Sequence, residues 1–431
     1  MNSNVAESSN SQSTKDIEYI PNTSKDIQET ICEIPPDKGY AWLMLIAGVL
    51  NYMVSFGSIS SFCVLETYYV LNMFPGISKL NVSLISTIGI SSMYVGGILG
   101  QPLIARFGLS GANCIGSFIG AIGIFFASFC TEIWQLVITQ GLIFGIGSSI
   151  VMNVSLLIPS LWFEKYLGLA LGTVISGSSL GTFILYPITT AALKAFGIQW
   201  TLRLLSLTFL LFTGFGSVLI KPRKEFFASK KIINLKHLKD PITVLLCASY
   251  FIFQMGFILI VLYFPLSVIA LGKSSYYAAK LSTIFGVSSA LGRILSGCLA
   301  NRFGCINIIM FSHAVVGTVM ILIWGLGKSV EVYIVAYILM GIFSVPYFVL
   351  GRVIIAKRYP SNYVSQVNGL MSLMMGIAVL IIVPVAGVAF DVKKYEIISW
   401  VKFISGFFYL LTVFILILLR IYLKPSLDHK I

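Results

Sequence analysis

The chain has 431 residues, of which 57% are hydrophobic and only 10% are charged. Water-soluble proteins carry about 25% charged residues, so this composition excludes an ordinary globular enzyme. The net charge is +13, and the basic residues lie mostly in short loops between apolar segments, where they indicate the orientation of membrane helices rather than binding of nucleic acid.

Residues 1–40 are expected to form a disordered cytosolic tail. Most of this stretch is rich in Ser, Asn, Thr and charged residues, and it contains no apolar core of a signal peptide. A segment of this composition cannot bury enough apolar surface to offset the entropy that folding costs.

Twelve apolar segments of membrane-spanning length follow the tail. Lipid cannot hydrogen-bond to exposed backbone groups, and the segments are too long for barrel strands, so we expect an all-α membrane protein with twelve transmembrane helices. The segments cover residues 41–66, 82–105, 112–131, 134–160, 167–194, 200–220, 242–270, 277–300, 306–326, 331–356, 364–390 and 397–422.

One polar loop divides these segments into two pseudo-symmetric groups of six. The expected parts are listed in chain order: an N-terminal half over 41–220, a basic cytosolic loop over 221–241, a C-terminal half over 242–424 and a short cytosolic tail over 425–431.

The basic residues of the loops predict the orientation. The short loops and helix ends carry nine Lys or Arg residues on each side, with Arg352 counted on one side and Lys402 on the other. The central loop adds seven more, and cytoplasmic loops are the ones enriched in Lys and Arg. We therefore expect this loop and both termini in the cytosol, with the plasma membrane favoured and a vacuolar or other internal membrane as the alternative.

A repeat relates the two halves. The stretch "GGILGQPLIARFG" ends at Gly108 and "GRILSGCLANRFG" ends at Gly304, and each follows the second predicted helix of its half. Parallel repeats of six helices are typical of one large transporter fold, in which the solute site lies near the membrane midplane between the halves.

The second copy also resembles the G-x-L-A-D-R-x-G loop of the major facilitator superfamily. The aspartate of that loop is Asn301 here, and the first copy has Ala105 at the matching position. The resemblance implies a gate that latches helix ends through charge pairing. Without the aspartate, the latch is expected to depend on Arg106 and Arg302 bonding to carbonyls at helix ends. The alternative is that these arginines only set the orientation.

Two further stretches resemble the signatures of the monocarboxylate transporter family. In "PPDKGYAW" the matching residues precede or begin the first helix, and in "WFEKY" they precede the fifth. The matching residues are Asp37, Gly39, Tyr40, Trp42, Trp162, Phe163, Lys165 and Tyr166. The stretch 56–76 is similar to the fungal branch of this family, which includes monocarboxylate permease homologues and riboflavin transporters.

The sequence departs from the proton-coupled members of that family at two positions. Those members carry a Lys near the position of Ser60 and an Asp at the position of Ser289. The arginine that follows this Asp by one turn is retained as Arg293. The departures leave open whether a coupling proton is a partner.

Arg293 is the strongest candidate for contact with a solute. An intramembrane charge costs about 2.5–3.5 kcal/mol on insertion scales, and no acidic residue lies near the middle of another predicted span. Contact with a solute or a gate is therefore one interpretation, and bonding to backbone carbonyls is the other.

Uncharged polar residues within the spans are weaker candidates. The resemblance implies that helices one, two, four, five, seven, eight, ten and eleven line the solute cavity. This selects Asn51, Asn153, Tyr186, Gln254 and Asn368 as solute-binding residues. For each of them, hydrogen bonding between helices is the alternative.

Glycine pairs spaced four apart predict close contacts between helices. They are Gly96/Gly100, Gly141/Gly145, Gly168/Gly172 and Gly177/Gly181. No nucleophile–base pair, phosphate-binding loop or metal-ligand cluster is recognisable, so no catalytic residue, cofactor or metal is expected.

These observations predict a secondary transporter of a small organic solute in the lipid bilayer. The resemblance implies monocarboxylate transporter-like transport, in which the two halves rock to expose the site to each side in turn. The alternatives are a riboflavin-type uptake permease and a non-transporting nutrient sensor that keeps the fold. No nucleic acid is expected as a partner.

Overall fold

The structure is a computed structural model, and it describes residues 35–77, 79–223, 240–389 and 395–422. All regular elements within these ranges are helices, as the apolar segments predict. Nearly all of the predicted N-terminal tail, most of the basic loop and the short C-terminal tail lie outside the described residues.

Short π- and 3₁₀-helical stretches interrupt several α-helices. The first half consists of α2 (Tyr40–Tyr68), η1 (Tyr69–Met73), α3 (Lys79–Val95), η2 (Gly96–Leu99), α4 (Gly100–Ala127), α5 (Ile133–Leu136), η3 (Val137–Ile143), α6 (Phe144–Trp162) and α7 (Leu167–Leu219). The second half consists of α8 (Pro241–Ala270), α9 (Ser275–Phe303), α10 (Cys305–Thr318), η5 (Val319–Trp324), α11 (Val330–Ser344), α12 (Pro346–Arg358), α13 (Ser361–Ala389) and α14 (Tyr395–Tyr422).

The described residues contain ten continuous helical runs that are long and apolar enough to cross a membrane. Two of these runs, of 47 and 53 residues, would measure about 70 and 80 Å as straight helices, more than twice the ~30 Å apolar core of a bilayer. Each contains a glycine with a left-handed backbone, Gly108 (φ 71°) and Gly197 (φ 73°), in a conformation that breaks the helix. Each run therefore holds two of the twelve predicted spans.

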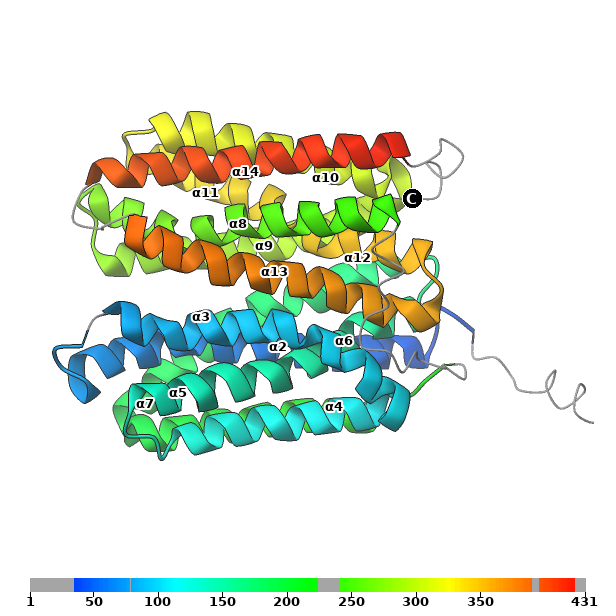
Figure 1. The fold of residues 1–431 in the computed structure, drawn as a ribbon, viewed down its shortest axis with the longest axis horizontal. Helices are drawn as coiled ribbons and strands as arrows, with labels where there is room; N and C mark the ends of the chain where they lie inside the picture. The colour runs from blue at the N-terminus through cyan, green and yellow to red at the C-terminus, as the bar shows by residue number, and fades with distance from the viewer. Residues whose placement is uncertain (1–34, 78, 224–239, 390–394, 423–431) are drawn as a thin grey trace, which may run out of the picture. The chain divides into compact units, whose positions relative to one another are not determined.

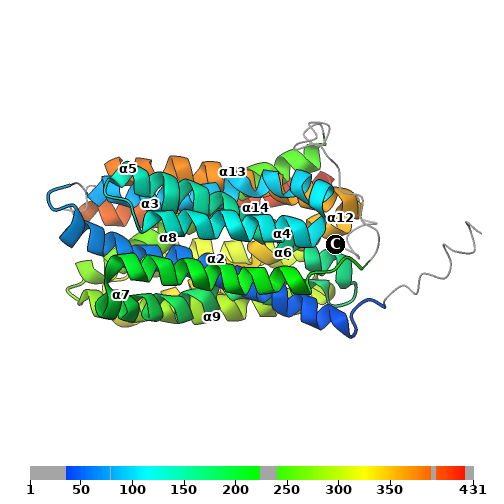
Figure 2. The ribbon, with the colours of Figure 1, turned by 90° about the horizontal axis from the view of Figure 1, so that it is seen from below.

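The helices of each half pack mainly on one another. In Figure 1, α2–α7 lie in the lower part of the view and α8–α14 in the upper part. The halves meet where α7 packs on α9 and where α3 packs on α13; Figure 2 shows α7 and α9 side by side. We call the end where α2 begins, on the right in Figure 1, the Asp37 end, and the other the opposite end.

The predicted glycine pairs lie at helix crossings, which confirms the expectation of close contacts. Gly96 and Gly100 of the segment after α3 face α6, and Gly177 faces the backbone of α2. Gly168 and Gly172 differ from the other pairs because they contact α9 and so join the two halves.

A tight glycine crossing inside the first half joins α4 and α6 at Gly147. A Cβ atom at Gly147 would lie 2.6 Å from the Cα of Gly120 and 2.7 Å from the carbonyl oxygen of Gly116. We therefore expect Gly147→Ala to destabilise the protein by about 1–3 kcal/mol, the usual cost of overpacking. Thermal unfolding of the detergent-purified protein measures this.

The matched control is Gly214→Ala in α7 of the same half. A Cβ atom at Gly214 meets no atom within 4 Å, and alanine favours helix over glycine by about 1 kcal/mol. Equal melting temperatures for the two variants would contradict the packing argument.

Candidate functional site

Arg293 of α9 is buried between the two halves, with 7% of its surface exposed. Its Nη1 donates to the hydroxyl of Ser179 in α7 at 2.6 Å, and its guanidinium lies 5.9 Å from the ring centroid of Phe348 in α12. Its Nε is sealed from solvent without a hydrogen-bond partner. The side chain thus has unused donor capacity, and no described backbone carbonyl accepts from it.

Arg352 of α12 is a second buried guanidinium. The prediction that it lies at a helix end or in a loop is wrong. Only 5% of its surface is exposed. Its Nη1 donates to the carbonyl oxygen (2.8 Å) and side-chain oxygen (3.2 Å) of Asn368, and its Nη2 donates to the Ser372 hydroxyl at 2.9 Å. Its guanidinium lies 5.4 Å from the ring centroid of Tyr250.

A signal in the sequence could have located Arg352. Apolar residues flank it in "VLGRVIIAKR", and Lys357 and Arg358 supply the basic end of the same helix. Lys402 is also buried rather than in a loop, and its Nζ donates to the Tyr333 hydroxyl at 2.6 Å. Removing one residue from each side of the loop count leaves eight against eight, so the central loop still decides the predicted orientation.

Neither Arg293 nor Arg352 makes an ion pair with a described residue. The two ion pairs found in the described ranges, Arg223–Glu164 and Arg358–Asp240, involve other side chains at the Asp37 end. The two buried arginines therefore form a region of uncompensated positive charge.

Two tyrosines of the first half border this charged region, and sequence reasoning missed both. Tyr52 of α2 and Tyr94 of α3 are buried and lie within electrostatic range of Arg293 and Arg352. Neither hydroxyl makes a hydrogen bond with another described residue. Tyr52 also stacks on Phe56, with ring centroids 5.7 Å apart. Hydroxyls from one half and guanidinium groups from the other thus border the same region.

Asn51 was predicted to bind solute, but its amide is used inside the first half. Its Nδ2 donates to Asn113 Oδ1 (3.1 Å) and Ser155 Oγ (2.9 Å). Asn113 in turn donates to the Thr213 carbonyl and the Ser217 hydroxyl, both at 2.9 Å. These contacts join α2, α4, α6 and α7, and they favour a structural role over solute contact.

Asn153 of α6 joins the two halves. Its Nδ2 donates to the Gly97 carbonyl at 2.8 Å and to the Ser365 carbonyl at 3.4 Å, and the Ser365 hydroxyl donates back to Asn153 Oδ1 at 2.5 Å. Because Ser365 belongs to α13 of the second half, these contacts favour a role in holding the halves together.

The other predicted residues have different surroundings. Asn368 accepts from Arg352 and so lies at the charged region. Gln254 is buried, and its Oε1 has no hydrogen-bond partner. Tyr186 is 41% exposed, on the part of α7 toward the opposite end. The structure therefore groups Arg293, Asn368 and Arg352, and places Tyr186 away from them.

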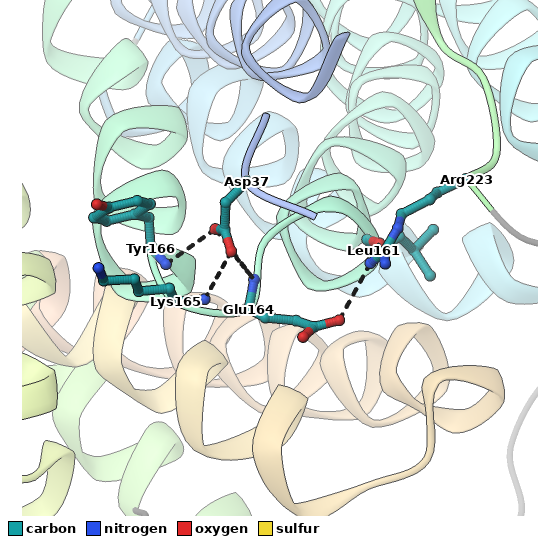
Figure 3. A network of polar contacts seen from close by, with 6 residues as sticks. All are labelled: Asp37, Leu161, Glu164, Lys165, Tyr166 and Arg223. Atoms are coloured by element: carbon teal, nitrogen blue, oxygen red, sulfur yellow. Dashed lines mark hydrogen bonds and ion pairs between the residues drawn. The ribbon is translucent and has the colours of Figure 1, made fainter. Parts of the chain in front are cut away.

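The two signature stretches meet at the Asp37 end. The Asp37 carboxylate accepts from the backbone N–H groups of Glu164 (3.3 Å), Lys165 (3.0 Å) and Tyr166 (3.1 Å), which precede α7 (Figure 3). The N–H of Asp37 donates to the Trp162 carbonyl at 3.0 Å. These amides belong to the turn that immediately precedes α7, and the N-terminal end of a helix favours a negative charge. Asp37 thus fixes the turn that leads into α7, and we call this contact the cap.

Aromatic residues of the same signatures pack around this cap. The ring of Trp42 lies edge-on to Phe163, with centroids 5.5 Å apart, and Tyr40 contacts Trp162 at 5.7 Å. The Tyr40 hydroxyl donates to the Leu219 carbonyl at 2.6 Å. The aromatic residues thus tie the start of α2 to the ends of α6 and α7.

The predicted gate residues do not behave as expected. Arg106 and Arg302 lie over the rings of their neighbours Phe107 and Phe303, both at 5.5 Å, and no described carbonyl accepts from either arginine. Asn301 instead makes the contact between halves, since its Nδ2 donates to the Lys165 carbonyl at 2.8 Å. The expectation that the two arginines form the latch is therefore corrected: an uncharged amide makes this contact.

Comparison with known proteins agrees with this architecture. The sequence pattern described as Major Facilitator Superfamily matches residues 41–324 and 246–430. The MFS transporter asaE of Aspergillus flavus is 27% identical over 390 residues, which cover 88% of each chain. The Agnestins efflux protein AgnL12 of Paecilomyces divaricatus is 28% identical over 394 residues, covering 90% of this chain and 89% of the relative.

Solved structures show the same fold. The crystal structure of the transporter FucP in the outward conformation superposes with a TM-score of 0.68 at 13% identity, covering 88% of this chain and 99% of FucP. The likeness at this identity concerns the fold alone. The sequence match shows that the chain belongs to the Major Facilitator Superfamily, whose members are secondary transporters of small molecules.

Proposed function

We propose that this chain transports a small organic anion, with a carboxylate as the expected charged group. The observation that carries the proposal is the pair of buried guanidinium groups, Arg293 and Arg352, without a carboxylate partner among the described residues. Arginine presents several donors in a planar fork that suits a carboxylate. A bound anion would neutralise charge that is costly inside a membrane protein.

Two tyrosines and two amide side chains complete the proposed site. Tyr52 and Tyr94 contribute hydroxyl donors from the first half, and Asn368, which accepts from Arg352, borders the site in the second half. We include Gln254, which is buried with a free Oε1 and lies one turn along α8 from Tyr250, the ring beside Arg352. Because the donors come from both halves, an anion at this position would contact both and could follow their rocking motion.

The state of the structure supports alternating access. Asn153, Asn301 and Arg293 make hydrogen bonds between the halves, and these lie from the middle of the helices to the Asp37 end. With that end in the cytosol, as the basic loop predicts, the structure represents a state closed toward the cytosol. Rocking of the halves would then open the Asp37 end and expose the site to the cytosol.

Riboflavin transport is the alternative within the family that the signature stretches resemble. The positive charge of Arg293 and Arg352 favours an anion over a neutral solute. The relative from Paecilomyces divaricatus is an efflux protein for agnestins, which makes export a second possible direction. A non-transporting sensor with the same fold is the rival class.

Solute uptake into proteoliposomes tests the proposal. We expect saturable uptake of at least one of lactate, pyruvate and benzoate, and weaker uptake of riboflavin. A protonophore would lower accumulation if a coupling proton is used. Uptake of riboflavin but of none of the three carboxylates would contradict an anion site, and uptake of no solute would favour the sensor.

The two arginines provide the sharpest test of the site. Arg293→Gln and Arg352→Gln each remove charged hydrogen bonds worth about 1.5–3 kcal/mol. We therefore expect kcat/KM for the transported carboxylate to fall by about tenfold to a hundredfold in each variant. The control is Lys402→Gln, which removes another buried cation of the second half but lies at Tyr333 rather than at the site.

Transport by the control variant should stay near that of the wild type at equal protein in the liposomes. Equal losses in Lys402→Gln and the arginine variants would show a general requirement for buried charge rather than an anion site.

Tyr52→Phe and Tyr94→Phe test the contribution of the first half. Each change removes one hydroxyl and keeps the ring, so the packing of Tyr52 on Phe56 should persist. We expect the KM for the carboxylate to rise by about tenfold or less, the range of a single hydrogen bond, with little change in melting temperature. An unchanged KM in both variants would remove the tyrosines from the site.

A further inference from the structure

We propose that Asp37 and Asn301 act together as a latch at the Asp37 end, in which Asp37 positions the acceptor and Asn301 provides the bond that breaks. The related loop has an aspartate at position 301, whereas this chain has its latch charge on Asp37 at the start of the first helix. The inference concerns how the transporter closes, and it does not depend on the solute.

The first part of the latch lies within the first half. The Asp37 carboxylate accepts from three consecutive backbone N–H groups, those of Glu164, Lys165 and Tyr166, at 3.0–3.3 Å for the closest oxygen of each (Figure 3). The N–H of Asp37 also donates to the Trp162 carbonyl. These bonds fix the peptide groups before α7, and with them the direction of the Lys165 carbonyl.

The second part crosses to the other half. The Lys165 carbonyl accepts from Asn301 Nδ2 at 2.8 Å, at the last turn of α9. Beside this bond, the backbones of Gly168 in α7 and Gly297 in α9 are in direct contact. Because the two helices touch here, any separation of α7 from α9 at this end breaks the Asn301 bond. The bonds of Asp37 join elements of one half and are kept when the halves move apart.

The chemistry of this contact explains the residue at position 301. A backbone carbonyl only accepts hydrogen bonds, so its partner must be a donor. An asparagine amide donates, whereas an ionised aspartate only accepts and would place a negative charge against the carbonyl oxygen and near Asp37. A donor side chain is thus needed at position 301, and asparagine supplies one.

A purely structural role for Asp37 is the competing explanation, because capping α7 alone would stabilise the fold. The two explanations differ for Asn301. If only the cap matters, a change at Asn301 has no effect on which end of the protein is open.

The test uses the native thiol of Cys63 as a reporter of the opposite end. Cys63 is exposed and lies three turns from Tyr52 on the same side of α2. In a variant that keeps Cys63 and has serine at the other cysteines, reconstituted in nanodiscs, the rate of maleimide labelling reports how often the opposite end is open.

We expect Asn301→Asp to slow Cys63 labelling by roughly twofold to tenfold at neutral pH, the range for one exposed hydrogen bond. The closed Asp37 end loses its bond, so the population moves toward the state that is closed at the opposite end. Asp37→Asn should change the rate in the same direction. The double variant should be no slower than the slower single variant, since both changes act on one contact.

A pH series separates the latch from a general loss of stability. A protonated aspartic acid can donate, so labelling of Asn301→Asp should return toward the wild-type rate as the pH falls toward 4, near the ordinary pKa of an aspartate, about 3.9. Asp37, Glu164 and Lys165 on the loop and Arg302 on α9 are the ionisable groups around position 301. Maleimide reacts with the thiolate, whose fraction falls with pH in every variant. The wild type is therefore measured at each pH, and the ratio of the variant rate to the wild-type rate is compared.

The matched control is Asn307→Asp. Asn307 also lies in the second half near this end, but its Nδ2 donates to the Phe303 carbonyl of its own half. Slowing by Asn301→Asp alone, with recovery in acid, supports the latch. The latch would be overturned if Asn301→Asp and Asn307→Asp slowed labelling equally, or if Asn301→Asp labelled at the wild-type rate at neutral pH.

Discussion

Arg293 and Arg352 place two positive charges where the chain provides no negative charge among the described residues. Hydrogen bonds to Ser179, Asn368 and Ser372 satisfy part of their donor capacity. They do not neutralise the charge, which costs several kcal/mol inside a membrane protein. Under the proposed function, a bound anion would supply the missing negative charge, so the electrostatic stability of the second half and solute binding would be linked.

The close approach of the helices is what brings these charges to the contact between halves. Gly172 has no side chain, and a Cβ atom there would lie 2.6 Å from the Arg293 carbonyl oxygen. This allows α9 to approach α7 closely enough for Arg293 to reach Ser179. Packing and the proposed recognition thus use the same stretch of the two helices, and we expect a larger residue at Gly172 to affect both.

The sequence predicted the parts of this structure that follow from composition and local pattern. Apolar length gave the spans, spacing of glycines gave the crossings, and the isolated charge of Arg293 gave one member of the site. Arg352 was missed because the basic end of the same helix, at Lys357 and Arg358, made it resemble a residue of that end.

Directions of side chains could not be predicted in helices that are apolar on all sides. A hydrophobic period distinguishes a core face from a wet face, but the helices of Asn51 and Asn153 are apolar along most of their length, so their sequences mark no single face. The role of Asp37 was equally invisible, because its partners lie 127–129 residues later in the chain. Tertiary contacts alone decide these positions.

The internal repeat has a consequence for how such a site can arise. Gly97 and Arg293 occupy the same position in the two copies, "GGILG" and "GRILS". In the first copy that position packs against Gly369 of the other half, and in the second it carries the guanidinium. After a duplication, one copy can keep the tight crossing while the other is free to acquire a charge, so the two halves can diverge in chemistry without loss of the helix contact between them.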